Sequence, residues 1–324
     1  MTDAPQLLMG ALSLDVYLGR DLVLPGGGTL NIAWSWRRSG VPFRLLSRVG
    51  DDRPEVFLAF LERHGIRPEP SLVAPGRSAS IDIVIRPDLQ PWMDNFVDGV
   101  WATFRLTPDE EAMLGGARGL HVVLVEGAIR ELRRLAGAGL TDGLEVSADF
   151  LSFRHYTLQR FAGTMADVDI GFVGWPGGTR DDGVRGLRAV AHDFGKLVVV
   201  TLGAQGVRVF DGRPGGGGDR FIPVDAVPVL GTTLGCGDAF IAGFLDAWRS
   251  SRDVTAAVER GKVLGAEATA WRRPLPDEAY GPEAVAALAA ADAAAAGDAA
   301  AAGDAAAAGD AAAAAGDEAA TAGR

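Results

Sequence analysis

Short continuous apolar runs alternate with amphipathic stretches between about residues 120 and 202. Such runs are typical of strands buried on both faces, whereas apolar positions three and four apart indicate helices. The alternation therefore predicts a parallel sheet covered by helices on both sides. We expect strands at 121–125, 144–150, 168–173 and 197–202, and helices at 129–136, 158–165 and 184–194.

The pattern before residue 70 predicts further strands and helices. Residues 6–18 alternate and then become apolar, which indicates a first strand with Asp15 at its end. The segment 25–33 is a glycine-rich turn that opens a helix ending at Gly40, although a flexible loop is the alternative for its glycines. A strand at 43–49 and a helix at 55–64 are expected next.

A small second sheet is predicted beside the main one. Residues 78–86 place isoleucines at alternate positions, the pattern of a half-exposed strand. Together with 96–104 they would form a flap that covers a site. We therefore expect one α/β domain over 1–280, with a small β-sheet lid made from parts of about 12–25 and 78–105.

The last part of the chain changes character after about Tyr280. Before it, a hairpin is expected from strands at 207–210 and 220–224, then a helix after Cys236 and another at 254–270. From about residue 286 the sequence repeats alanine, glycine and aspartate, and we assign 281–324 to this low-complexity tail. Each glycine costs a helix about 1 kcal/mol relative to alanine, and no apolar stripe is present, so we expect this tail to be disordered or transiently helical.

Composition and charge narrow the class of protein. The chain has 324 residues, of which 48% are hydrophobic and 23% charged, values ordinary for a soluble globular protein. Its net charge of -11 argues against a nucleic-acid partner. The single cysteine excludes an intrachain disulfide and fits a reducing cytoplasm. No run outside the alanine tail reaches membrane-spanning length without charges, so no membrane partner is expected.

The stretch from Thr232 to Trp248 carries the strongest chemical signal. Gly235, Cys236 and Gly237 allow close approach of backbone N–H groups, and the apolar positions that follow have helical spacing. The unpaired N–H groups and the positive dipole end of a helix N-terminus favour a phosphate-sized anion. Asp238 then lies in the first helical turn, where the alternative interpretation is a simple helix cap.

Four motifs in this order resemble the ribokinase-like (PfkB) family of carbohydrate kinases, over about residues 7–270. The most specific is Thr232 to Asp238, TTLGCGD, which is similar to the family's Asp-Thr-x-Gly-Ala-Gly-Asp. The others are GGGTLN at 26–31, VGDD at 49–52 and TLGAQG at 201–206. The resemblance implies a ribokinase-like three-layer α/β sandwich, with a mostly parallel central sheet and a small β-sheet lid.

Within the family, the chain is most similar to the fructoselysine 6-kinase-like branch, on segments 97–102, 106–110, 200–203 and 240–245. That branch phosphorylates a sugar-amine conjugate on its primary hydroxyl. The resemblance thus implies an ATP-dependent, Mg²⁺-using kinase for a sugar or sugar-amine conjugate. A homodimer formed through the lid is a further possibility, because exposed sheets pair readily.

The resemblance also implies roles for individual residues. Asp238 would accept the proton of the attacking hydroxyl, and the N–H groups of Gly235, Cys236 and Gly237 would hold the charge that develops on the transferred group. The sugar-binding candidates are Asp15, Gly26, Gly27 and Asn31, with Glu126 a weaker one. The candidates that line the nucleotide are Thr201, Gly203, Gly206 and Thr233. Turn capping is the alternative for Asp15 and Asn31.

Two departures from the family pattern keep other interpretations open. Thr232 replaces an aspartate that helps build a monovalent-cation site, which makes potassium activation doubtful. The family's Asn-x-x-Glu, associated with magnesium, would fall near 172–180, where the sequence is FVGWPGGTR. The magnesium ligands are therefore unassigned, and phosphates and water would supply most of them. The alternatives are a kinase for a simple pentose, hexose or nucleoside, and a non-catalytic sugar- or nucleotide-binding relative.

Overall fold

The computed structural model describes residues 4–19, 22–86, 89–176, 182–282, 284–286 and 288–289. Within them, the main element is an eight-stranded sheet in the order β14-β13-β12-β11-β10-β9-β1-β4. The strands from β4 to β12 in this order pair in parallel, and β13 and β14 add an antiparallel edge. Their bounds are β1 Gln6–Met9, β4 Phe43–Leu46, β9 Gly119–Val123, β10 Glu145–Ser152, β11 Ile170–Gly174, β12 Leu197–Thr201, β13 Val207–Asp211 and β14 Arg220–Ile222.

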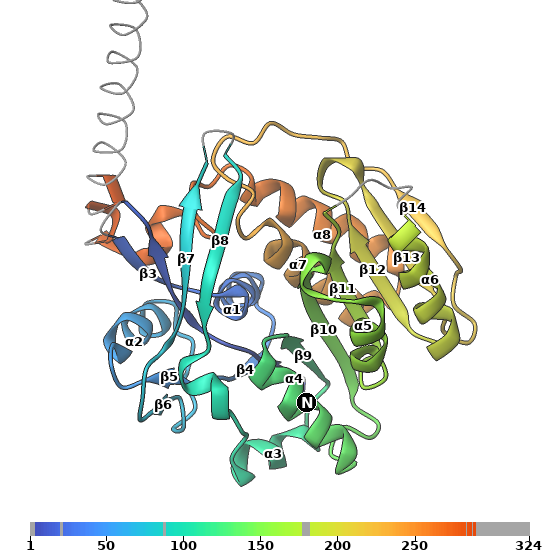
Figure 1. The fold of residues 1–324 in the computed structure, drawn as a ribbon, viewed down its shortest axis with the longest axis horizontal. Helices are drawn as coiled ribbons and strands as arrows, with labels where there is room; N and C mark the ends of the chain where they lie inside the picture. Colours follow the sequence, from blue (N-terminus) through green and yellow to red (C-terminus); the bar gives the residue numbers. More distant parts are fainter. Residues whose placement is uncertain are drawn as a thin grey trace, which may run out of the picture.

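Helices cover both faces of this sheet, as Figure 1 shows. One face packs against α1 Gly28–Ser39, α2 Pro54–Arg63, α7 Cys236–Ser251 and α8 Val254–Ala268. The other packs against α3 Pro108–Leu114, α4 Glu126–Gly137, α5 Leu158–Met165 and α6 Asp182–Phe194. Neighbouring strand residues enter opposite cores, for example Val198 and Val199, because side chains alternate along a strand. The three-layer α/β arrangement predicted from the alternation is confirmed.

A four-stranded sheet, which we call the lid, has the order β3-β2-β7-β8 and stands apart from the main sheet. Its strands are β2 Ser13–Tyr17, β3 Leu22–Gly26, β7 Ala79–Ile85 and β8 Pro91–Val97. The expected single strand over 6–18 is wrong. It divides at Gly10, where a Cβ atom would lie 2.2 Å from Thr29 Oγ1, and Asp15 lies in the middle of β2 instead of at a strand end.

The predicted lid strand at 96–104 is also wrong. The chain turns at Gly99, whose φ of 52° suits glycine, and residues 99–103 form the 3₁₀ helix η1 Gly99–Thr103. Trp101 in that helix is fully buried against α4 residues of the core, which draws the segment away from the lid. The predicted strand at 43–49 likewise divides into β4 and β5 Val49–Gly50, which pairs with β6 Val73–Ala74.

The chain continues as packed structure beyond the boundary expected near Tyr280. The 3₁₀ helix η4 Asp277–Tyr280 is followed by Ala284, which packs against the lid, and by Leu288, which is fully buried there. Both join a small apolar cluster on the inner face of the lid. The rest of the predicted tail, from residue 290, lies outside the described residues. Among the helices of the described ranges, none combines the length and apolarity needed to cross a membrane.

Candidate active site

Two helix N-termini bring Asn31 and Asp238 together. Asn31 lies in the first turns of α1 and Asp238 in the first turn of α7, 207 positions later. Asn31 Nδ2 donates a hydrogen bond of 2.7 Å to Asp238 Oδ2. A side-chain amide at this position thus fixes the carboxylate and leaves Asp238 Oδ1 without a hydrogen bond among the described residues. The sequence motifs predicted both residues, and the structure places them in contact.

Close packing of α1 against α7 makes this contact possible. A Cβ atom on Gly28 would lie 2.8 Å from Asp238 Oδ1, so only glycine leaves room for the carboxylate there. Further along, the Trp36 indole N–H donates to Ala242 O at 3.2 Å and ties the two helices together. Gly27, with φ of 92°, begins α1 in a conformation that suits glycine. The glycine-rich turn is therefore a packing requirement of the site.

The turn before α7 offers free backbone donors. Gly235 caps the helix in the left-handed conformation, with φ of 82°. In the described part of the chain, the N–H groups of Gly235, Gly237 and Asp238 make no hydrogen bond, whereas Cys236 N–H donates to Thr233 O at 3.3 Å. An anion at this helix end would therefore meet Gly235 and Gly237 rather than all three predicted donors. Burial raises the pKa of the Cys236 thiol to about 12, which does not favour a reactive thiolate.

Three buried or partly buried carboxylates gather at the site. Burial raises the pKa of Asp238 to about 6, partly offset by the Asn31 hydrogen bond. Burial also raises the pKa of Asp15 to about 7, where the Ser13 hydroxyl at 2.9 Å lowers it and the charge of Asp238 raises it further. Asp149 behaves alike, with a pKa of about 7 caused by burial and then by the Asp238 charge. None of the three is ion-paired within the described residues.

Asp149 is the residue that sequence reasoning missed. It lies in β10, is 5% exposed, and pairs in register with Val123 of β9. Its Oδ1 accepts the Leu151 N–H at 2.8 Å, next to an irregularity in the strand where Leu151 takes a φ of 55°. The available signal was a carboxylate among the buried positions 146–150 of β10, which is costly unless it serves the site.

Buried polar atoms without partners mark where a ligand would bond. Asn31 Oδ1 and Thr29 Oγ1 are buried and have no hydrogen-bond partner in the described structure. Buried polar groups are usually satisfied, so such atoms indicate a missing donor. Gly26, by contrast, faces Asp15: a Cβ there would lie 2.1 Å from Asp15 Oδ2. Its role is to make room for that carboxylate.

The nucleotide candidates lie further along the same edge of the sheet. Thr201 ends β12, and Gly203 and Gly206 follow with φ of 56° and 123°. Since neighbouring strands are about 4.8 Å apart, β12 lies roughly 10 Å from β10, a distance that a triphosphate can span. Thr233 faces the lid instead, because its hydroxyl donates to Gln90 Oε1 at 3.0 Å.

Glu126 is not brought to the carboxylate cluster by any described contact. It begins α4, its side chain is 56% exposed, and it forms an ion pair with Arg160. A helix start, where the dipole favours an acid, accounts for a glutamate at that position. The place of the family's Asn-x-x-Glu holds Gly174, Trp175 and Pro176, and the remainder, 177–180, lies outside the described residues.

No group of three metal-ligating side chains occurs in the described ranges. Burial raises the pKa of all three carboxylates, which means that their ionised forms lack a counter-ion, and a bound cation would stabilise those forms. Magnesium often binds through one or two carboxylates together with phosphate oxygens and water. The residues present therefore fit a magnesium ion that arrives with a nucleotide.

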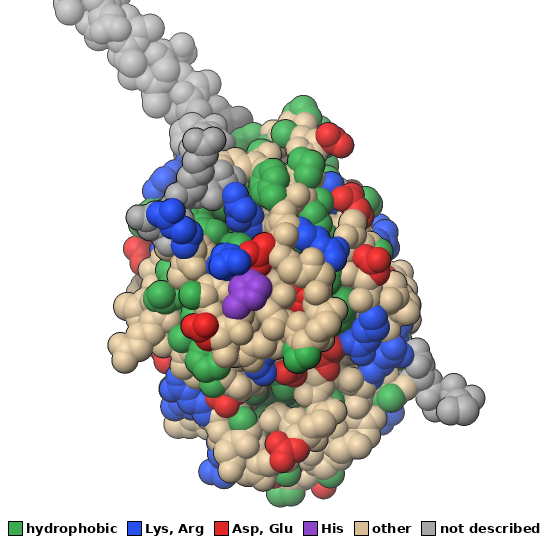
Figure 2. Space-filling view, turned by 90° about the vertical axis from the view of Figure 1, so that its right-hand side faces the viewer, with side chains coloured by type: hydrophobic (Ala, Val, Ile, Leu, Met, Phe, Trp, Pro, Cys, Tyr) green, Lys and Arg blue, Asp and Glu red, His purple; other side chains and the backbone are tan. Residues whose placement is uncertain are grey.

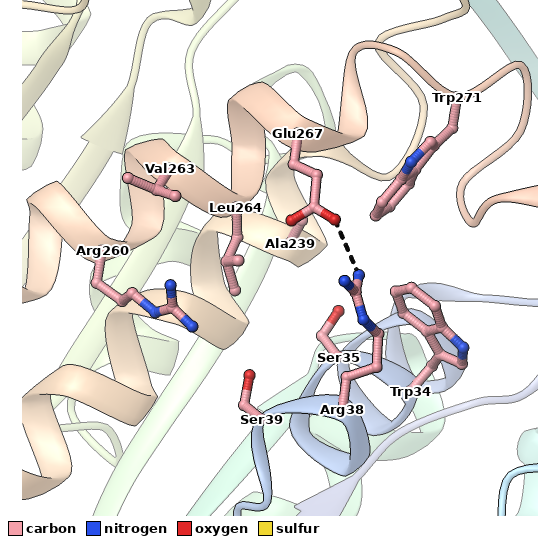
Figure 3. Close-up of a pocket in the computed structure, with 10 residues that line it drawn as sticks. All are labelled: Trp34, Ser35, Arg38, Ser39, Ala239, Arg260, Val263, Leu264, Glu267 and Trp271. Atoms are coloured by element: carbon pink, nitrogen blue, oxygen red, sulfur yellow. Dashed lines mark hydrogen bonds and ion pairs between the residues drawn. The ribbon is translucent and has the colours of Figure 1, made fainter.

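A separate hollow of about 280 Å³ lies between α1, α7 and α8, away from the carboxylates. Figure 3 shows Arg38 and Glu267 paired across it, with Trp34 and Trp271 on one side. Ala239 at its floor follows Asp238 directly, and Ser35 lies one turn beyond Asn31. None of the three carboxylates Asp15, Asp149 and Asp238 is among the residues that line this hollow.

Comparison with known proteins finds kinases that are named for sugar or nucleoside substrates. Residues 171–274 match the family model described as pfkB family carbohydrate kinase. Fructoselysine 6-kinase of Escherichia coli is 26% identical over 262 residues, covering 80% of this chain and 95% of that protein. Cytidine kinase of Thermococcus kodakarensis is 26% identical over 273 residues, covering 79% and 92%.

Solved structures share the fold. An E. coli structure described as a ribokinase II in complex with ATP and Mg²⁺ superposes with a TM-score of 0.66 at 15% identity, over 84% of this chain and 94% of that one. The ribokinase-like α/β fold, with its large mostly parallel sheet and separate small sheet, is thus confirmed. Over residues 171–274 the chain is thus similar to the pfkB family of carbohydrate kinases, and the similar curated proteins are named as kinases of fructoselysine and of cytidine.

Proposed function

We propose that this protein is a cytoplasmic ATP-dependent kinase that transfers the γ-phosphoryl group to a hydroxyl of a sugar or sugar-amine conjugate. The observation that carries the proposal is the 2.7 Å contact between Asn31 and Asp238 at the N-terminus of α7, beside the free N–H groups of Gly235 and Gly237. A base and an anion site are then adjacent. Phosphoryl transfer needs this positioning and charge stabilisation more than covalent chemistry.

Each part of the site has a role in this reaction. Asp238 accepts the proton of the attacking hydroxyl, and Asn31 holds its carboxylate in place. The N–H groups of Gly235 and Gly237 stabilise the charge on the transferred group. Asp15 and Asn31 Oδ1 accept hydrogen bonds from sugar hydroxyls. Bound magnesium would neutralise phosphate charge, with Asp149 as the described carboxylate placed to contribute a ligand.

The charge of the site favours a substrate that carries a cation. Asp15, Asp149 and Asp238 have no cationic partner in the described structure, so a protonated amine on the substrate would complement them. This supports a sugar-amine conjugate, the substrate type in the name of the E. coli relative. A nucleoside is the second candidate, because the cytidine kinase matches at the same identity.

ATP turnover against a panel of fructosamines, ketohexoses, ribose and nucleosides tests the function, with and without potassium. We expect turnover with a fructosamine and little dependence on potassium, since Thr232 lacks a carboxylate for that ion. Preferred turnover of a nucleoside would select the second candidate. If ligands bind but no panel member is phosphorylated, the protein is a binding relative and the proposed function is wrong.

The pH profile should report the carboxylate cluster. We expect kcat/KM to fall as the pH drops through about 6, because Asp238, with its pKa raised to about 6, must be ionised to act as a base. The charge of Asp238 also raises the pKa of Asp15 and of Asp149, so the titration of these two carboxylates contributes to the same acid limb of the pH profile. Asn31→Ala removes a hydrogen bond that lowers the Asp238 pKa, so the acid limb should move to higher pH.

The control for this measurement is Asn95→Ala, an exposed asparagine of the lid whose amide bonds Asp82. It should leave the profile in place. An acid limb that stays fixed in Asn31→Ala would show that this amide does not set the pKa of the base.

We also infer that the lid mediates a homodimer. Val84 and Trp92 are cross-strand neighbours on its outer face, and their exposed fractions are 37% and 43%. Figure 2 shows acidic and basic side chains interspersed on the face that it presents. A second copy of the lid would cover the apolar pair, as flat exposed sheets tend to pair.

Light scattering during size-exclusion chromatography checks this inference. The wild type should elute as a dimer at micromolar concentration, and Trp92→Ser should shift it toward monomer. Phe194→Ser, which changes a residue 46% exposed on α6, is the matched control and should remain dimeric. A wild type that is monomeric under these conditions would rule out the lid dimer.

A further inference from the structure

The tip of the lid touches the turn that precedes α7. Thr232 Oγ1 donates to Leu89 O at 3.2 Å, and Thr233 Oγ1 donates to Gln90 Oε1 at 3.0 Å. Figure 1 shows the adjoining ends of β7 and β8 beside the segment that leads into α7. Two consecutive hydroxyls of one turn therefore bond two consecutive residues of the lid.

Thr232 lies where several segments meet. It is fully buried, and its N–H donates to Trp271 O at 2.8 Å. Its hydroxyl also accepts the Leu234 N–H at 3.2 Å, immediately before the helix cap Gly235. One oxygen thus joins the lid tip to the backbone of the anion-binding turn. Leu89 has a φ of 62°, a conformation that non-glycine residues keep only where contacts hold it.

We propose that Thr232 is a positioning residue, which couples the lid to the anion-binding turn before α7. Asp15 lies on β2, in register with Ile81 of β7, the lid strand whose hairpin Thr232 holds. Fixing the lid tip therefore fixes both the sugar-side carboxylate and the phosphate-side turn. The kinetic part of this proposal rests on the proposed function, whereas the structural part does not.

The chemistry of the hydroxyl explains why a threonine serves here. A hydroxyl donates one hydrogen bond and accepts others, whereas an ionised carboxylate only accepts. The aspartate of the family motif could not donate to Leu89 O. The threonine of this chain satisfies a lid carbonyl and a turn N–H with one atom, and it adds no charge to a site already rich in carboxylates.

Hydrogen–deuterium exchange in Thr232→Val tests the coupling without any substrate. Valine keeps the shape and removes the hydroxyl, so peptides covering 79–97 and 226–236 should both exchange about five-fold faster, as expected for one lost hydrogen bond. Thr232→Ser retains the hydroxyl and should exchange like the wild type. Thr164→Val is the matched control, since Thr164 is 1% exposed and bonds only a carbonyl of its own helix.

Thr233→Val provides a second test at a partly exposed position and removes only the bond to Gln90. It should raise exchange in the lid peptide as well. Unchanged lid exchange in Thr233→Val and in folded Thr232→Val would overturn the proposal, as would faster exchange confined to one of the two peptides in Thr232→Val.

Turnover separates this proposal from the proposed function. On a panel substrate, kcat/KM should fall about ten-fold in Thr232→Val and recover in Thr232→Ser, roughly the effect of one hydrogen bond that positions reacting groups. An equal loss in Thr232→Ser would contradict a role for the hydroxyl. If exchange responds as expected but no wild-type turnover is found, the coupling stands and the kinase assignment falls.

Discussion

Asp238→Asn is expected to lower kcat roughly a thousand-fold, within the range for loss of a general base, with little change in KM. The amide keeps the size of the side chain but cannot take the proton from the attacking hydroxyl. We expect the variant to fold and to be no less stable than the wild type. Burial raises the Asp238 pKa to about 6, so at a pH above 6 the ionised carboxylate lowers the stability of the folded protein relative to the unfolded chain. The variant should therefore melt at an equal or higher temperature.

Steady-state kinetics measure the loss of kcat, and thermal unfolding measures the change in melting temperature. Both are carried out at a pH above about 7, where the destabilisation caused by the ionised Asp238 is fully present. Asp246→Asn is the matched control, because it makes the same change further along α7 and should leave both quantities unaltered. Activity retained in Asp238→Asn would eliminate Asp238 as the base.

Gly235→Ala should have the second largest effect. Gly235 has φ of 82°, and an added Cβ would lie 2.7 Å from the Cα and O atoms of Pro274. The backbone has to move, which costs about 1–3 kcal/mol of stability. The same movement displaces a donor of the anion site, so kcat should fall by about a hundred-fold or more. Chemical denaturation and kinetics on the same preparation give the two values.

Gly237→Ala is the stability control, since a Cβ there meets nothing within 4 Å, and its free energy of unfolding should not fall. Gly116→Ala, in a loop with nothing within 4 Å, is the control for activity. A fully active and stable Gly235→Ala would mean that the turn does not need its left-handed conformation.

Most of the fold could be predicted from the local pattern of residues along the sequence. The buried strands of the main sheet and the helix starts after Gly27 and Gly235 were predictable, because strand periodicity, glycine placement and helical spacing are properties of neighbouring residues. The lid was harder. The alternation of β7 is visible in the sequence, but β8 is an edge strand with mixed residues, and the burial of Trp101 that moves 99–103 out of the lid depends on distant contacts.

In the site, too, residues in local sequence motifs were predictable, whereas features that depend on distant contacts or on backbone geometry were not. Asp238 and Asn31 belong to motifs, so their positions were predictable, whereas Asp149 acquires its place only when β10 aligns with β9 in the parallel sheet. Glu126 was expected at a strand end, but the chain has already entered α4 there and pairs the glutamate with Arg160. Cys236 N–H was expected to be free, yet a turn to Thr233 O uses it. Each difference arises from backbone geometry that residue identity does not fix.

Transfer of radiolabel from γ-labelled ATP to a sugar tests the central claim most directly. Wild type and Asp238→Asn are incubated with a fructosamine, and the products are separated into sugar phosphate, ADP and inorganic phosphate. The account predicts label in the sugar phosphate for the wild type, and its loss in the variant. Label that reaches the sugar equally in both proteins, or only inorganic phosphate from the wild type with every sugar offered, would contradict it.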